Sequence, residues 1–102
     1  MTGDGMRLDK WLWFARFCKS RTLAQKLCEG GGVDVGGRLV TRCHHLIHPG
    51  DVLSIRQGNW QRTVTVVAPG VRRGPAPEAR TLYEEPVPPV RIPLDDIEEI
   101  PP

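Results

Sequence analysis

The sequence predicts an α+β domain in which two N-terminal helices pack on a small antiparallel sheet, followed by a short C-terminal helix and an extended tail. Apolar residues recur at helical spacing early in the chain, and the period changes to two after three consecutive glycines. Hydrophobic residues make up 39% and charged residues 25% of the 102 residues, which is typical of globular proteins. A chain of this length holds about one domain, so helices followed by strands indicate the α+β class.

The first helix is predicted over residues 6–17, where apolar residues recur at spacings of three and four. Trp11 and Phe14 are expected in the core, whereas Trp13 could form a partly exposed platform. Asp9 falls in the first turn, where a negative charge suits the helix dipole.

A second helix is predicted over residues 21–29, with Ser20 as its N-cap. The glycines at 30–32 supply the left-handed residue that ends a helix and let the chain reverse. One side of this helix is expected to face the core through Leu23, Ala24, Leu27 and Cys28.

Short strands alternate with turn signals beyond the glycines. Gly36–Gly37 fits a two-residue hairpin turn, and Pro49–Asp51 and Gln57–Asn59 mark further turns. The predicted strands cover residues 33–35, 38–41, 52–56 and 61–68.

The C-terminal part is predicted to contain a short helix over residues 78–85 that carries Leu82 and Tyr83 back to the body. From Pro86 onward six of seventeen residues are proline and acids cluster, a composition typical of extended or mobile segments. The predicted organisation is a folded domain over 6–70, an extension over 71–85 and an acidic tail over 86–102.

Several protein classes are disfavoured. No apolar run approaches the roughly eighteen residues of a membrane-spanning helix, and the N-terminus lacks a secretory signal pattern. Cys18, Cys28 and Cys43 form an odd set without paired spacing, which fits reduced thiols in the cytoplasm better than a disulfide framework.

The net charge of +2 conceals a strong asymmetry. Residues 1–73 hold twelve Lys or Arg against five acids, a charge of +7, whereas residues 74–102 hold two against seven, a charge of −5. A basic body attracts phosphate chains, and an acidic tail can compete for the same surface.

Signals of enzyme chemistry are weak. Cys43, His44, His45 and His48 are potential metal ligands, but structural zinc sites use well-separated ligand pairs, and adjacent strand side chains point to opposite faces. No oriented base accompanies Cys43, and the glycine triplet follows a helix, unlike nucleotide-binding loops. We therefore expect no catalytic residue, no metal and no cofactor.

Cations gather on both predicted helices and on the hairpin that follows. If the helices pack through their apolar stripes, these cations converge on one rim with the free N–H groups of the second helix, which favours phosphate binding. Nucleic-acid binding is the favoured interpretation, with a basic module for an acidic protein and a merely solvated face as alternatives. The rim comprises Arg7, Lys10, Arg16, Lys19, Ser20, Arg21, Gln25, Lys26, Arg38 and Arg42.

Four ordered segments resemble the S4 RNA-binding domain: RLDKWL at 7–12, SRTLA at 20–24, GVDVGG at 32–37 and PGDVL at 49–53. Over about residues 6–86, with QGN at 57–59 and LYEE at 82–85, the chain also resembles the ribosome-associated fifteen-kilodalton heat shock protein family. Gly36 stands where Asn is common in this domain, and the tail is acidic where the family's extension is basic.

The resemblance implies a stand-alone, non-enzymatic RNA-binding protein of the large ribosomal subunit. It would recognise ribosomal RNA on stalled subunits that retain a nascent chain on tRNA, and act in their recycling after heat stress. It maps RNA contacts onto both helices, onto the glycine-rich turn into Val33 and onto the hairpin at 36–38. The helix residues are Arg7, Lys10, Ser20, Arg21, Gln25 and Lys26. We expect the protein to be a monomer. An alternative to the ribosome-associated function is an orphaned RNA-targeting domain of an RNA-modifying enzyme.

The acidic tail is expected to lie near the basic rim and to weaken nonspecific RNA binding, because its charge opposes that of the rim. A solvated tail without a role is the alternative.

Overall fold

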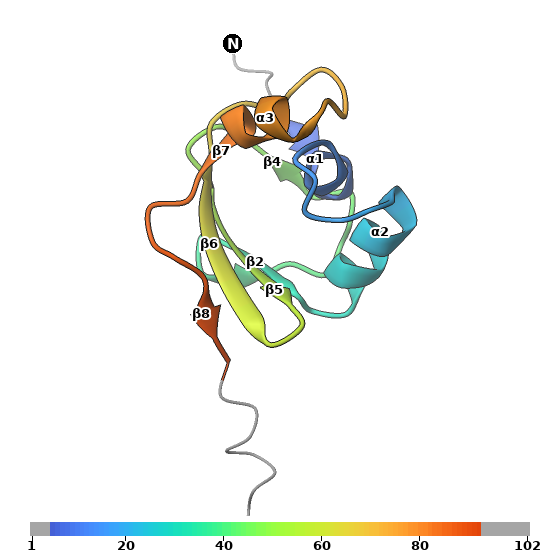
Figure 1. Cartoon of the computed structure of the whole chain (residues 1–102). Helices are drawn as coiled ribbons and strands as arrows, with labels where there is room; N and C mark the ends of the chain where they lie inside the picture. The colour runs from blue at the N-terminus through green and yellow to red at the C-terminus, as the bar shows by residue number, and fades with distance from the viewer. Residues whose placement is uncertain (1–4, 93–102) are drawn as a thin grey trace, which may run out of the picture.

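The computed structural model describes residues 5–92, in which two short helices lie against a curved antiparallel sheet (Figure 1). The buried side chains between them form one apolar core. The large sheet has the strand order β3-β2-β5-β6-β7, with β8 also paired to β6, and β1 and β4 form a separate pair. This architecture confirms the predicted α+β class.

The elements are β1 (Met6–Arg7), α1 (Leu8–Phe14), α2 (Arg21–Glu29), β2 (Val33–Val35), β3 (Arg38–Leu39), β4 (Leu46–Ile47), β5 (Val52–Gln57), β6 (Trp60–Val66), α3 (Ala76–Ala79), a 3-10 turn (Arg80–Leu82), β7 (Tyr83–Glu84) and β8 (Val90–Arg91).

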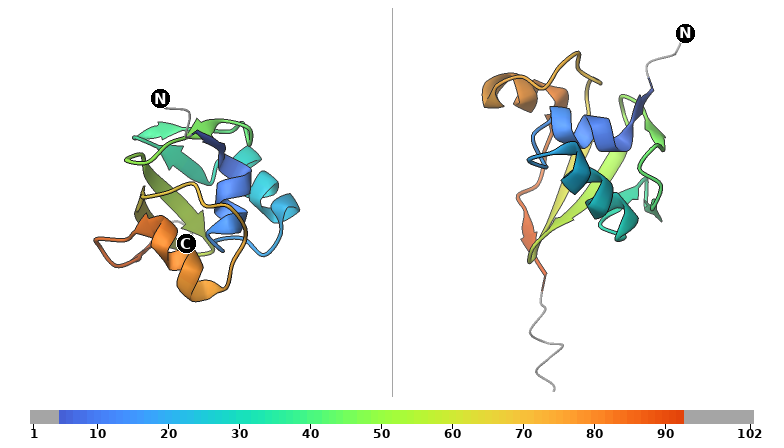
Figure 2. Two further views of the ribbon diagram at one scale, coloured as in Figure 1. Left: turned by 90° about the horizontal axis from the view of Figure 1, so that it is seen from above. Right: turned by 90° about the vertical axis from the view of Figure 1, so that its right-hand side faces the viewer.

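The β5–β6 hairpin supplies the main inner face of the sheet. Leu53 pairs with Val64 in its register, and both side chains are buried, as are Ile55 and Val66. This alternation follows from the two-residue period of a strand, which sends every second side chain toward the helices. α1 and α2 lie together against this face, as the two views in Figure 2 show.

The β2–β3 hairpin confirms the turn predicted from Gly36–Gly37. Both glycines have positive φ, 60° and 87°, as the tight turn that matches strand twist requires. Side chains other than Asn or Asp are strained there, so the glycine pair explains how the hairpin closes with two residues.

The first helix is shorter than the predicted 6–17. Met6 and Arg7 instead form β1, which pairs with Ile47 and Leu46 of β4, so a strand contact distant in sequence sets the start of the helix. The helix ends at Phe14, because Arg16 takes a left-handed conformation with φ of 66°. The prediction was wrong at both ends because helical spacing cannot reveal a distant strand partner.

The second helix spans Arg21–Glu29 as predicted. The Ser20 hydroxyl accepts a hydrogen bond from the Leu23 N–H at 3.1 Å, and Gly31 follows the helix with φ of 82°. Its predicted apolar side is only partly correct, since Ala24 and Cys28 are buried whereas Leu23 is 47% exposed. The small Ala24 and Cys28 side chains let the helix approach the core.

The C-terminal segment returns to the body by a different route from the predicted helix over 78–85. α3 and the 3-10 turn end at Leu82, and Tyr83 then begins β7. Leu82 is buried and Tyr83 packs on the core, as expected. Beyond Pro86, Val90–Arg91 forms β8 against β6, while the predicted tail continues past residue 92, outside the described residues.

Trp11 lies at the centre of the core and is fully buried. Its indole N–H donates to the Ala68 carbonyl at 2.9 Å, and its ring meets Phe17 and Tyr83 at centroid distances of 5.8 and 6.3 Å. Trp11 therefore joins α1 to the segment after β6 and to β7. Across residues 5–92, none of the helices has the length and apolar character needed to cross a membrane.

Replacing Trp11 by Phe is expected to lower the free energy of unfolding by about 1–3 kcal/mol, because the buried ring loses volume and the Ala68 carbonyl loses its donor. Urea denaturation followed by circular dichroism measures this. The matched control is Trp60→Phe at an exposed position, expected to change stability by less than about 0.5 kcal/mol. Equal effects of the two substitutions would contradict the role given to Trp11.

Candidate functional site

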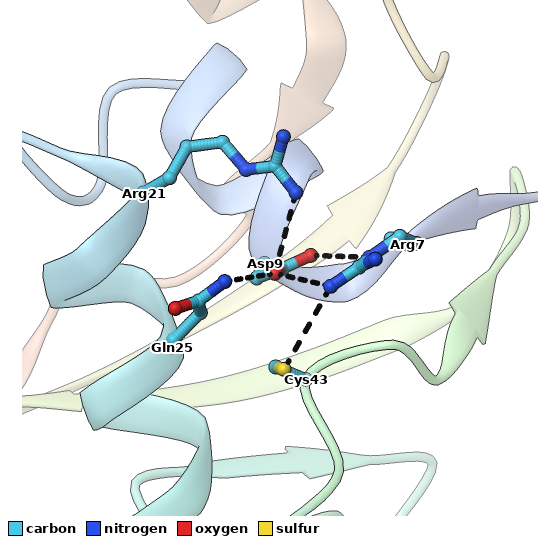
Figure 3. Close-up of polar contacts among 5 residues, drawn as sticks. All are labelled: Arg7, Asp9, Arg21, Gln25 and Cys43. Atoms are coloured by element: carbon cyan, nitrogen blue, oxygen red, sulfur yellow. Dashed lines mark hydrogen bonds and ion pairs between the residues drawn. The ribbon is translucent and has the colours of Figure 1, made fainter.

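A fully buried carboxylate, Asp9, lies where the start of α1 meets α2 (Figure 3). Arg7 donates to both of its oxygens, from Nε to Oδ1 at 3.1 Å and from Nη2 to Oδ2 at 2.9 Å. Gln25 Nε2 and Arg21 Nη2 donate to Oδ2 at 3.2 and 3.4 Å. These four residues, Arg7, Asp9, Arg21 and Gln25, are called the Asp9 cluster below.

The local fold explains why the four side chains converge. Arg7 ends β1 and precedes α1, so its side chain lies beside the first helical turn that carries Asp9. Arg21 and Gln25 are four residues apart on α2, which places them on one face of that helix. The packing of α1 against α2 therefore brings one anion and two cations together.

Burial opposes ionisation of Asp9, but hydrogen bonds from Arg7 and Gln25 and the charges of Arg7 and Arg21 outweigh it. The pKa of Asp9 consequently lies below its ordinary value. The same hydrogen bond and charge raise the pKa of Arg7. At neutral pH the cluster thus carries two cations and one anion.

Both arginines keep N–H groups at the surface. The side chain of Arg7 is 44% exposed and that of Arg21 is 37% exposed, whereas the Asp9 carboxylate between them is fully buried. Arg21 is held by one long contact, and its buried Nε has no acceptor among the residues described. A phosphate arriving at this surface would therefore meet Arg7, which two hydrogen bonds orient, and beside it Arg21, which one long contact holds.

The other predicted site residues divide into groups. Lys10 and Arg7 line one open concavity of about 450 Å³, and Arg38 and Arg42 line another of about 280 Å³. Lys19 and Lys26 are exposed and form no ion pair within residues 5–92. Ser20 caps α2 and Gly37 lies in the β2–β3 turn, as described above.

Arg16 lies away from the Asp9 cluster. Its Nε donates to the Gly74 carbonyl at 2.6 Å, after the turn in which Arg16 leaves the helical conformation. Its expected place on the first helix is therefore wrong, because α1 ends before it.

Asp9 was not predicted as a site residue. Its expected role was to complement the helix dipole, whereas in the structure its carboxylate accepts hydrogen bonds from two arginines on separate elements. The available signal was an acid within an otherwise basic stretch, beside Arg7 and ahead of the Arg21 and Gln25 pair. Cys43 was likewise not predicted to lie beside Arg7, although its Sγ is 3.9 Å from Arg7 Nη2.

The Cys43–His48 segment does not assemble a metal site in the part of the chain that the structure describes, where no group of three or more His, Cys, Asp or Glu is placed to hold an ion. Leu46 and Ile47 within it form β4.

Comparison with known proteins places this site in a family context. The S4 domain family model matches residues 6–53, a range that contains the entire Asp9 cluster. Heat shock protein 15 of Escherichia coli strain K12 is 48% identical over 80 residues, which cover 78% of this chain and 59% of that protein. The chain therefore spans about three-fifths of the length of this relative.

A shorter relative is covered more completely. The RQC P-site tRNA stabilizing factor of Halalkalibacterium halodurans is 44% identical over 80 residues, covering 78% of this chain and 88% of that protein. A trimeric structure of Vibrio cholerae heat shock protein 15 superposes with a TM-score of 0.75 at 40% identity, covering 79% of this chain and 81% of that one.

Replacing Asp9 by Asn is expected to lower the free energy of unfolding at pH 7 by about 1–3 kcal/mol, because charge-assisted bonds to two arginines are lost. Since the folded pKa lies below the ordinary value of 3.8, the advantage of wild type is complete above that pH and shrinks as pH falls through the folded pKa. Urea denaturation at a series of pH values measures both effects.

The matched control is Asp34→Asn on β2, where the carboxylate has no side-chain hydrogen bond or ion pair within residues 5–92. This substitution is expected to change stability by less than about 0.5 kcal/mol. A wild-type advantage over Asp9→Asn that does not vary with pH would contradict the proposed ionic cluster.

Proposed function

This chain belongs to the S4-domain family that includes heat shock protein 15 and the RQC P-site tRNA stabilizing factor, and from that premise we propose that it binds ribosomal RNA on the large subunit. The observation that carries the proposal is the Asp9 cluster, which presents two oriented arginines within the S4-matched residues. In this role the protein recycles stalled subunits that retain a nascent chain on tRNA after heat stress.

The names of the relatives support this choice of target. One relative is named for stabilising tRNA in the P site and another for heat shock, and neither name denotes an enzyme. We infer a binding protein without catalytic activity that acts in the cytoplasm, where ribosomes translate. The expected monomer stays part of this proposal, since the trimeric arrangement is that of the Vibrio cholerae protein.

The mechanism begins with electrostatic capture of phosphates. Arg7 and Arg21 can donate their remaining N–H groups to phosphate oxygens, because Asp9 engages only part of each guanidinium group. Ser20 and Gln25 would add neutral hydrogen bonds, and the glycine turn at Gly37 lets the backbone approach the RNA closely. Further phosphate contacts are assigned to Lys10, Lys19, Lys26, Arg38 and Arg42.

Recognition then depends on the shape of the RNA. The major groove of an RNA duplex is deep and narrow, so side chains cannot easily read bases there. Two cations held beside one buried carboxylate instead respond to the spacing of phosphates, which differs between a regular duplex and a junction or loop. This explains how an S4 surface of a few side chains could select structured RNA.

Affinity for RNA is expected to fall with salt at a log–log slope of about −3 to −4 if about five phosphates are neutralised. Arg7→Gln and Arg21→Gln should each weaken binding, and each should make the slope shallower by the contribution of about one phosphate contact. Arg91→Gln on β8 removes the same charge at a distance from the Asp9 cluster and should leave the slope nearly unchanged. Filter binding at several salt concentrations gives the slope for wild type and for the three variants. A slope near zero for wild type would refute phosphate capture.

The proposed target is tested by sedimenting cell extract through a sucrose gradient and assaying each ribosomal fraction for the protein. We expect wild type with free large subunits, enriched after heat stress, and the Arg7→Gln, Arg21→Gln double variant at the top of the gradient. Wild type absent from every ribosomal fraction would contradict the ribosomal role, even if binding to purified RNA persisted.

A further inference from the structure

Two cationic concavities lie on either side of the segment Cys43–Leu46. Leu46 lines the larger one together with Arg7 and Lys10, whereas the preceding residue, His45, lines the smaller one with Arg38 and Arg42. Cys43 and His44 form a turn in which the His45 N–H donates to the Arg42 carbonyl at 3.1 Å, and Leu46 then begins β4, so this short segment separates the two concavities.

The larger concavity, of about 450 Å³, combines a cationic edge with apolar walls. Arg7 and Lys10 supply the charge, and Met6, Leu46 and Pro69 supply apolar surface. None of its lining residues is acidic. Pro69 lies beyond residue 53, so this concavity is completed by a part of the chain outside the S4 match.

The separating segment is firmly held. The N–H groups of Leu8 and Asp9 donate to the carbonyls of His45 and Cys43 at 2.8 and 3.1 Å, and Leu46 pairs with Arg7 in the β1–β4 ladder. Lys10 is also positioned, with Nζ 5.4 Å from the centroid of the Phe14 ring. The edge of the larger concavity is therefore formed before any ligand arrives.

The smaller concavity, of about 280 Å³, has the same character. Arg38, Arg42 and His45 provide polar and cationic groups, Leu39 and Val40 provide apolar surface, and again no lining residue is acidic. A polyanion that crosses the Cys43–Leu46 segment would therefore meet cations on both sides of it.

We propose that a single-stranded stretch of RNA crosses the Cys43–Leu46 segment and places one unpaired base in the larger concavity. The phosphates on either side of that base lie on Arg7 and Lys10, and the strand continues toward Arg42. The base packs its faces against Met6, Leu46 and Pro69. This inference rests on the proposed RNA binding and adds a nucleotide subsite to it.

The chemistry of the concavity favours an unpaired nucleotide over other anions. A nucleotide joins a flat, largely apolar base to a charged phosphate, which matches apolar walls beside two cations. A paired base cannot enter, because its faces are covered by stacking within the duplex. An acidic peptide would satisfy the cations and leave the apolar walls without a partner.

The test compares two RNA hairpins by fluorescence anisotropy. Both carry a single-stranded extension of five nucleotides, but one extension is abasic, so the phosphates are equal and the bases differ. Wild type is expected to bind the extension with bases about tenfold more tightly, near the lower end of the range for stacking one base on an aromatic side chain, because the walls here are aliphatic.

Leu46→Glu places a carboxylate in the larger concavity and is expected to abolish the preference for bases. Leu46 is 53% exposed, so this substitution should leave the fold intact, and Leu46→Gln repeats the test without the charge. Val90→Glu on β8, at a residue 62% exposed, adds the same charge elsewhere and should keep the tenfold preference.

The possible outcomes distinguish failure of the proposed nucleotide subsite from failure of the proposed RNA binding. Loss of the preference in both Leu46 variants but not in Val90→Glu supports the subsite. Wild type that binds both hairpins equally, or Leu46 variants that keep the preference, overturns the subsite and leaves RNA binding in place. Wild type that binds neither hairpin overturns the proposed function itself.

Discussion

The structure depends on one ionic interaction, the buried carboxylate of Asp9 held by Arg7, Arg21 and Gln25. Removing an ionised carboxylate from water costs several kcal/mol, and it is tolerated only when charge-assisted hydrogen bonds replace the lost hydration. The same bonds fix two guanidinium groups at the surface. The contact between α1 and α2 and the orientation of the proposed RNA contacts therefore share one interaction, and a change at Asp9 alters both.

The Cys43–Leu46 segment links the start of α1 to the rest of the fold. The first N–H groups of a helix lack partners within the helix, and here two of them donate to carbonyls of this segment. Because it also pairs with β1, the segment holds Arg7 in place beside Asp9. A stretch whose cysteine and histidines first drew attention as metal ligands thus acts through its backbone and through the concavities that it separates.

Two arginines at the contact between the end of α1 and the loop after β6 show why a count of charges overstates the proposed RNA surface. Arg73 donates from Nε to the Trp13 carbonyl at 3.0 Å and lies 5.5 Å from the Trp13 ring centroid, and Arg16 donates to the Gly74 carbonyl. These two cations fasten the loop after β6 to the end of α1. The S4-matched residues are therefore covered by a later segment, whose Leu82 and Tyr83 also complete the core around Trp11.

The sequence by itself determined the fold class, the second helix with its Ser20 cap, and the Gly36–Gly37 hairpin, because each depends on neighbouring residues and local backbone preference. It also assigned Arg7 and Arg21 to the candidate site by charge and by resemblance. Only the tertiary structure decided that α1 begins after a strand, that Arg16 turns toward Gly74, and that Asp9 is buried between two arginines. Those features arise from contacts between residues far apart in the chain, and periodicity carries no information about which distant groups meet.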